Sequence, residues 1–106
     1  MSEATTIPVA APKLRSMIAA IFEAAGAPPE DAATVAEVLV EADLRGVESH
    51  GSTRVAGYVS MIREGLLNPR PKVEVLRETP VTAMLEGDRA FGIVVARRAM
   101  GMAIDK

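Results

Sequence analysis

The stretch DLRGVESHGSTR, residues 43–54, lies between two helical patterns and contains the only histidine of the chain. Before it, apolar residues recur at helical spacing up to about Arg45, and Gly46 suits the reversal that ends a helix. After it, we expect a new helix that begins near Ser49, because a serine hydroxyl can accept a hydrogen bond from a backbone N–H of the first turn. The stretch therefore predicts a reversal between two helices, with His50 at the start of the second one.

His50 and Arg54 form the main candidate site in this stretch. Positions four residues apart lie on the same face of a helix, and the apolar stripe that begins at Val55 leaves both side chains at its edge. An imidazole, with an ordinary pKa of roughly 6.5, can exchange a proton near neutral pH, and a guanidinium pairs with a carboxylate. We therefore expect both side chains at the rim of a pocket that holds an acid beside the group that moves its proton. The alternative is a structural histidine and a solvated arginine.

Outward from this stretch, the hydrophobic spacing predicts four helices and two strands. The expected helices cover residues 12–25, residues 28 to about 45, about 49 to 65, and about 88 to the chain end, and the expected strands cover residues 72–78 and 82–86. Ile7–Val9 could add a short edge strand. The predicted fold class is therefore α+β, with a subdomain of three helices followed by two short strands and a fourth helix.

The end of the chain bears on the expected domain organisation. No glycine or proline follows the last helical pattern, which runs into Asp105-Lys106. We interpret this as a chain that is cut inside a helix. Residues 1–71 would then form an N-terminal helical subdomain that carries the Ser-His-Gly motif, and residues 72–106 would begin the strand–helix part of a larger, missing cofactor domain.

Composition limits the function classes. The 106 residues suffice for one small domain, and with only 3% aromatic residues its core must be mainly aliphatic. The net charge of −2 offers no basic field for nucleic acid. The absence of cysteine excludes disulfides and thiolate metal sites, and with one histidine a zinc site is not expected. We see neither a signal peptide nor an apolar run of about 20 residues that could span a bilayer, and we expect a cytoplasmic protein without membrane contact.

Residues 43–51, followed by Arg54 and Tyr58, resemble the N-terminal signature of the malate/L-lactate dehydrogenase family. This oxidoreductase family is unrelated to the Rossmann-type enzymes of the same name, and it includes ureidoglycolate and sulfolactate dehydrogenases, diketogulonate reductases and cyclic imino-acid reductases. The similarity continues through residues 65–69, 86–88 and 99–100, and covers nearly the whole chain from about Leu14.

The resemblance implies an NAD(P)-dependent enzyme that interconverts 2-hydroxy acids and 2-oxo acids. His50 would transfer the proton, Arg54 would hold the substrate carboxylate, and Ser49 would either contact substrate or only cap the helix. NAD or NADP would be bound mainly by residues beyond Lys106, and no G-x-G-x-x-G loop occurs in this chain. The family habit implies a homodimer in the full-length parent, and the chain alone should be inactive. Malate, lactate, sulfolactate and cyclic imino acids all stay open as substrates.

Two other function classes compete with this interpretation. The chain could be a truncated, non-catalytic helical module that acts through association of its exposed helical faces. A small helical DNA-binding domain is disfavoured by the acidic charge balance. Among further residues, Asp43 and Glu48 could orient His50, Tyr58 fits the core with a solvated hydroxyl, and Arg97-Arg98 fits a helix surface or a contact to the missing domain.

Overall fold

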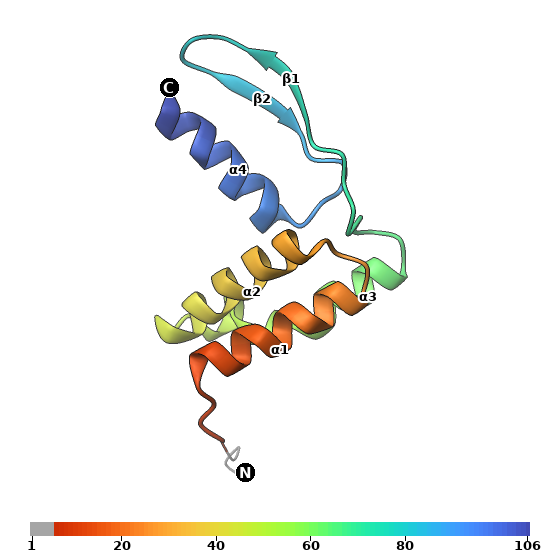
Figure 1. Ribbon diagram of the computed structural model, residues 1–106, viewed down its shortest axis with the longest axis vertical. Helices are drawn as coiled ribbons and strands as arrows, with labels where there is room; N and C mark the ends of the chain where they lie inside the picture. The colour runs from red at the N-terminus through yellow and green to blue at the C-terminus, as the bar shows by residue number, and fades with distance from the viewer. Residues whose placement is uncertain (1–5) are drawn as a thin grey trace.

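The computed structural model describes residues 6–106 as an α+β fold, as predicted (Figure 1). In chain order the elements are α1 (Ala11–Ala24), α2 (Pro29–Leu44), the 3-10 turns η1 (Glu48–His50) and η2 (Ser52–Arg54), α3 (Val55–Arg63), β1 (Glu74–Glu78), β2 (Ala83–Glu86) and α4 (Gly92–Asp105). Helices α1, α2 and α3 gather at one end of the molecule, and the strand pair lies with α4 at the other. Residues 6–10 contain no strand, so the edge strand expected at Ile7–Val9 is wrong.

The antiparallel pair of α1 and α2 forms most of the core. A proline occupies the first turn of each helix, where its missing N–H costs no hydrogen bond. Phe22 of α1 and Val35 and Leu39 of α2 are at most 1% exposed. Burial of each such side chain stabilises the fold by about 1.5–3 kcal/mol. The last turn of α2, which leads into residues 45–54, is therefore attached to the best-packed part of the molecule.

Three aromatic rings join α1, α3 and the start of α4. Phe22, Tyr58 and Phe91 pair edge-to-face in all three combinations, with ring centroids 5.2–6.3 Å apart. Phe22 and Phe91 are buried, and Tyr58 is partly buried against the same core. Edge-to-face pairs contribute about 0.5–1.5 kcal/mol beyond the area they bury. The prediction that Tyr58 belongs to the core is confirmed.

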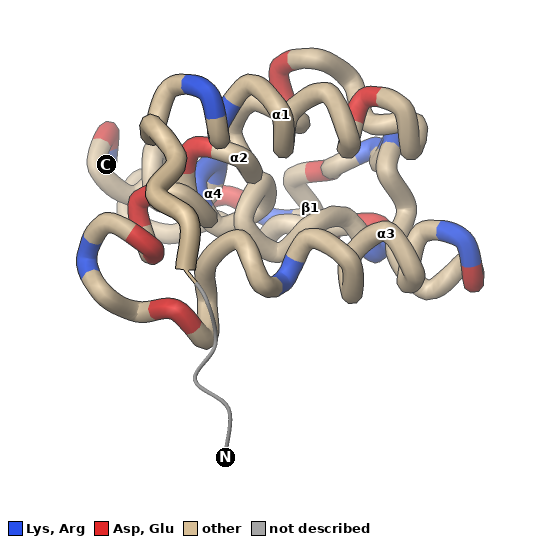
Figure 2. Tube along the Cα trace, turned by 90° about the horizontal axis from the view of Figure 1, so that it is seen from below, with Lys and Arg blue, Asp and Glu red and all other residues tan. Residues whose placement is uncertain are grey.

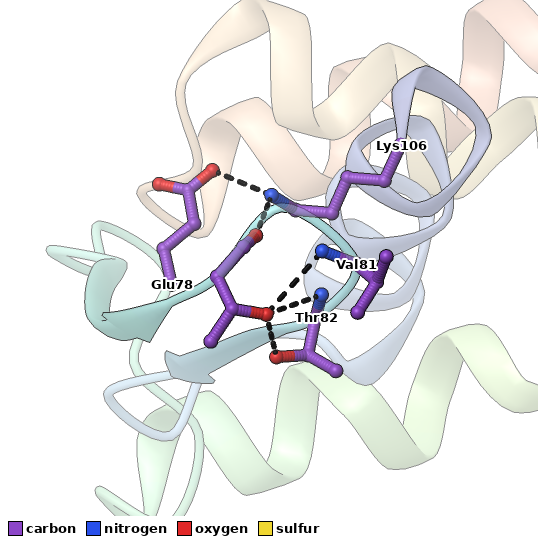
Figure 3. A network of polar contacts seen from close by, with 5 residues as sticks. Glu78, Val81, Thr82 and Lys106 are labelled. Atoms are coloured by element: carbon purple, nitrogen blue, oxygen red, sulfur yellow. Dashed lines mark hydrogen bonds and ion pairs between the residues drawn. The ribbon is translucent and has the colours of Figure 1, made fainter.

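Hydrogen bonds in the turn between β1 and β2, and from the end of α4, stabilise the strand pair. β1 and β2 are antiparallel, with an irregularity between Val75 and Arg77. The hydroxyl of Thr79 accepts hydrogen bonds from the backbone N–H groups of Val81 and Thr82. The ammonium of Lys106 donates to Oε1 of Glu78 at 3.0 Å and to the carbonyl of Thr79 at 2.6 Å (Figure 3). This network fixes the last residue of the chain against the strand pair.

The fourth helix begins at Gly92, four residues later than the start expected near Asp88. Asp88 and Arg89 instead have φ values of +54° and +56°, in the left-handed region. The Asp88 carboxylate accepts hydrogen bonds from Asn68 Nδ2 and from the backbone N–H of Lys72. Asp88 is therefore held in a turn that ties the connector after α3 to the strand pair, and it cannot join the helix.

An ion pair links the two ends of the molecule. Both terminal nitrogens of Arg97 on α4 donate to the carboxylate of Glu37 on α2, at 3.2 and 3.3 Å. These hydrogen bonds, and the guanidinium charge, hold the pKa of the Glu37 carboxyl below its ordinary value. The neighbouring Arg98 donates to the carbonyl of Val73. Arg97 and Arg98 are exposed, as expected for a helix surface, and both also bind other parts of the described chain.

The surface charges do not form a field of one sign. Figure 2 shows basic and acidic positions interspersed along the trace. Within residues 6–106, none of the helices has the length and hydropathy that would let it cross a membrane.

The aromatic cluster gives a test of the core. Phe91→Ala should lower the free energy of unfolding by about 3–5 kcal/mol, because it removes a buried ring and leaves a cavity between the helices. Chemical denaturation followed by circular dichroism measures this loss. Ile104→Ala, in the helix that follows Phe91, is the matched control, since Ile104 is 76% exposed, and its effect should stay within about 0.5 kcal/mol. A loss below about 1 kcal/mol for Phe91→Ala would contradict the packing described.

The Glu37–Arg97 pair makes stability depend on pH. Because the pKa of Glu37 is lowered in the folded state, the pair stabilises the fold above the ordinary carboxyl pKa, and this contribution is lost as the pH falls through the folded-state value. Carboxyl ¹³C NMR titration should show the pKa of Glu37 rising toward its ordinary value in Arg97→Ala. Arg98→Ala should leave the Glu37 pKa unchanged, since Arg98 donates to a backbone carbonyl. Equal effects of the two variants would refute the assignment.

Candidate functional site

The segment that carries the candidate residues is not the continuous helix expected from Ser49. It consists of the two 3-10 turns η1 and η2, separated by Gly51 with φ −101° and ψ −145°, and α3 begins only at Val55. Ser49 caps no helix, since neither turn has a side-chain cap hydrogen bond. The argument that helical spacing aligns His50 with Arg54 is therefore wrong, and their relation has a different origin.

Asp43, in the last turn of α2, holds this segment in place. Both oxygens of its carboxylate accept the backbone N–H of Ser52, at 3.2 and 3.1 Å. Gly51 is buried against the same carboxylate, and a Cβ atom at position 51 would overlap it. A glycine is required here because the carboxylate occupies the space that any other side chain would need. Asp43, one of the two acids considered for orienting His50, thus contacts the backbone next to it.

His50 and Arg54 come together on Ser49. The hydroxyl of Ser49 lies 2.8 Å from Nδ1 of His50, and the carbonyl of Ser49 accepts the Nε–H of Arg54 at 2.8 Å. One residue thus contacts the imidazole with its side chain and the guanidinium with its backbone. The structure places the three predicted site residues side by side, although by turn geometry and not by helical periodicity.

The site is a surface and not a closed pocket. His50, Ser49 and Arg54 are all exposed. The nearest depression, of about 610 Å³, is formed by η2 and α3 with one residue of α1; its lining residues are Ile21, Ser52, Thr53, Val55, Ala56, Val59, Ser60 and Arg63. None of the five cavities described on residues 6–106 is lined by His50 or Arg54. The recess expected between the two side chains is thus not formed by the described residues alone.

The other candidates of this stretch have structural roles. The backbone carbonyl of Glu48 accepts the hydroxyl of Thr53 at 2.9 Å, which ties η1 to η2. The role of Asp43 as the acceptor for Ser52 was not predicted. A carboxylate near the end of one helix, followed by a glycine within ten residues, is only a weak signal, because the partner is a backbone N–H that carries no sequence signature.

No group of three or more His, Cys, Asp and Glu side chains that could hold a metal ion occurs within residues 6–106. The first turn of α2 carries Glu30 and Asp31, whose charges would oppose a diphosphate at that helix N-terminus. What the site offers is a guanidinium and an imidazole, a pair suited to a small acid.

Comparisons with known proteins identify the family of the chain. A family model for malate/L-lactate dehydrogenase matches residues 9–106. L-sulfolactate dehydrogenase from Methanocaldococcus jannaschii is 39% identical over 92 residues, covering 87% of this chain and 27% of that protein. Ureidoglycolate dehydrogenase (NAD(+)) from Escherichia coli K12 is 46% identical over 80 residues, covering 76% of this chain and 23% of that protein.

A solved structure shows the same fold. Malate dehydrogenase from Pyrococcus horikoshii OT3 matches with a TM-score of 0.90 and 46% identity, covering 93% of this chain and 28% of that chain. The chain spans about a quarter of the length of the curated relatives it matches. Because the family model covers nearly all of the sequence and the fold agrees, the chain belongs to the malate/L-lactate dehydrogenase family.

Proposed function

We propose that this chain is the N-terminal part of an NAD(P)-dependent oxidoreductase that interconverts 2-hydroxy acids and 2-oxo acids. The supporting observation is the convergence of His50 and Arg54 on Ser49, on an exposed turn that is clamped to α2. Residues 1–71 would form the helical subdomain that presents this turn. Residues 72–106 would begin the cofactor domain, and the relatives named malate and sulfolactate dehydrogenase suggest the substrate class.

Arg54 would bind the substrate carboxylate. Its Nε–H is committed to the Ser49 carbonyl, which restricts the guanidinium. No group within residues 6–106 accepts a hydrogen bond from its terminal nitrogens, so both stay available for a carboxylate. A bidentate pair of this kind fixes the orientation of an acid as well as its position.

His50 would move the proton. Oxidation of a 2-hydroxy acid removes the hydroxyl proton and a hydride from C2, and the nicotinamide cofactor supplies the hydride acceptor. If Nδ1–H donates to the Ser49 hydroxyl, Nε2 carries the lone pair that takes the hydroxyl proton. In the reverse direction the imidazolium returns that proton to the oxygen of the 2-oxo acid.

Ser49 would contact both His50 and the substrate. A hydroxyl has one donor and two acceptor positions, so it can accept Nδ1–H of His50 and still donate to a substrate oxygen. A substrate contact by Ser49 is therefore compatible with its contact to His50. Capping, the alternative role considered for this serine, does not apply.

The exposure of the site bears on the activity of the chain. A carboxylate paired with an exposed guanidinium gains only about 0–1 kcal/mol, too little to hold a substrate. The proposed site therefore needs a second surface that excludes water. We attribute that surface, and the binding of NAD or NADP, to further parts of the enzyme, which acts as a homodimer.

Association without catalysis is the second candidate. Its supporting observation is the set of large apolar side chains that stay exposed on α1 and α3, among them Met17 at 50%, Ile21 at 42% and Met61 at 39%. Analytical ultracentrifugation of the 106-residue chain distinguishes this candidate from the enzyme fragment. A module that acts by association should self-associate or bind a partner in the absence of a cofactor domain.

The purified 106-residue chain should show no turnover with NADH or NADPH and any 2-oxo acid. A chimera in which residues 9–106 replace the matching segment of the Pyrococcus horikoshii malate dehydrogenase should be active, because the two segments share 46% identity and one fold. Absorbance at 340 nm follows the reaction. Cofactor-dependent turnover by the isolated chain, or a folded but inactive chimera, would contradict the proposal.

Variants of the chimera test the two roles separately. His50→Ala should lower kcat by about 10²–10⁴-fold, the usual contribution of a positioned acid–base group. Arg54→Ala should mainly raise KM, by about 10- to 100-fold, because it removes a charge-assisted hydrogen bond to substrate. Arg63→Ala is the matched control, since Arg63 is an exposed arginine at the end of α3. Wild-type kinetics for both His50→Ala and Arg54→Ala would show that the site is assigned wrongly.

A further inference from the structure

We propose that Asp43 is a positioning residue for His50: its carboxylate fixes the turn that holds the imidazole against Ser49. This inference rests on the proposed proton-transfer role of His50 and assigns a residue outside the proposed substrate contacts. It follows from the contacts between the end of α2 and residues 47–54.

Helix α2 is held rigidly by the core. Val35, Leu39 and Val40 are at most 1% exposed, so the helix axis is fixed by the core. Asp43 lies in the last turn of this helix and is partly buried. Its backbone therefore has little freedom, and its carboxylate is a fixed acceptor.

Two backbone N–H groups attach the following segment to this helix. The backbone N–H of Val47 donates to the carbonyl of Ala42 at 2.9 Å. The backbone N–H of Ser52 donates to both oxygens of Asp43 at 3.2 and 3.1 Å. His50 lies between these two points, so the carboxylate defines one end of the short arc that carries the imidazole.

Gly51 makes the contact close and specific. It is buried directly against the carboxylate, and a Cβ atom there would overlap the Asp43 oxygens. The residue after His50 thus lies on the carboxylate itself. Any displacement of Asp43 changes the position of Gly51. This in turn changes the direction in which the side chain of His50 points.

The effect on His50 passes through Ser49. The Ser49 hydroxyl is 2.8 Å from Nδ1 of His50, and adjacent residues keep such a contact only while the backbone between them holds one geometry. A neutral imidazole has two tautomers, and the hydrogen bond of one ring nitrogen selects which of them is populated. The proposed function has Nδ1–H donating to the Ser49 hydroxyl, and by holding this contact Asp43 would maintain the Nδ1–H tautomer, in which Nε2 can accept a substrate proton.

Glu48, the other acid considered for this role, does not fit it. Its side chain is exposed and only its backbone carbonyl is used, as the acceptor for Thr53. Glu41 pairs with Arg45 on the outside of the same helical turn, which makes it a suitable control position.

The test uses the 106-residue chain, in which every imidazole NMR signal belongs to His50. At about pH 8.5, two units above the ordinary imidazole pKa, long-range ¹⁵N–¹H spectra report the tautomer. Wild type should show Nδ1 protonated. Asp43→Ala should show a mixture of both tautomers, whereas Asp43→Asn, which keeps one acceptor oxygen, and Glu41→Gln should stay close to wild type.

The opposite results would overturn the proposal. These are a wild-type chain in which Nδ1 is not protonated, or an Asp43→Ala chain with wild-type ring nitrogen shifts. A further measurement needs no variant, in case Asp43→Ala does not fold: the Ser52 amide of wild type should exchange with solvent more slowly than an unstructured amide. A Ser52 amide without protection would equally refute the role.

Kinetics of the chimera separate this proposal from the proposed function. Asp43→Ala should lower kcat by about 10- to 100-fold with little change in KM, as expected for a misplaced proton-transfer group, and Asp43→Asn should restore most of it. If His50→Ala stays active, the proposed function fails although the tautomer result can still hold. If His50→Ala is inactive and Asp43→Ala has wild-type kcat, the function stands and the positioning role fails.

Discussion

The contact of the Asp43 carboxylate with Gly51 and the Ser52 N–H is the constraint on which the rest of the site depends. A carboxylate that faces the backbone this closely leaves no room for a side chain at residue 51. Gly51, whose φ of −101° and ψ of −145° are not helical, interrupts any helix that would run from Ser49 into α3. The two 3-10 turns on either side of it and the start of α3 at Val55 accompany this contact.

Fewer contacts join the strand pair and α4 to the three-helix part than join α1, α2 and α3 to one another. Phe91 inserts into the aromatic cluster, Arg97 pairs with Glu37, and the left-handed turn at Asp88 binds the connector after α3. The polar contacts among these are exposed or partly buried, and exposed ion pairs add little stability. The apolar packing of Phe91, with Ile93 and Val94 of α4 beside it, therefore carries most of the coupling between the strand pair with α4 and the three-helix part.

Local sequence signals were sufficient for the α+β class and for most element boundaries. Prolines at the starts of α1 and α2, and buried residues at helical spacing such as Val35 and Leu39, reflect interactions within or next to one helix, which periodicity detects. The errors fall where a side chain binds backbone distant in the sequence. The carboxylate of Asp43 binds the N–H of Ser52 and that of Asp88 binds the N–H of Lys72, and both contacts override the local helix preference. Their partners are backbone N–H groups, which have no pattern that a single sequence reveals. The candidate residues were thus found with the correct neighbours but for an incorrect geometric reason.

The arrangement around Ser49 also bears on why an acid is the natural ligand. A lone imidazole on a surface has no preference among proton donors, and a lone guanidinium holds an acid without reacting with it. Here one residue contacts both groups at 2.8 Å, and in the proposed function a carboxylate bound by Arg54 would bring its neighbouring carbon toward His50. In a 2-hydroxy acid that carbon bears the hydroxyl group. Under the proposed function, this spacing would favour acids whose reactive oxygen is on the adjacent carbon, and an acid with a more distant hydroxyl would bind without placing its proton near the imidazole.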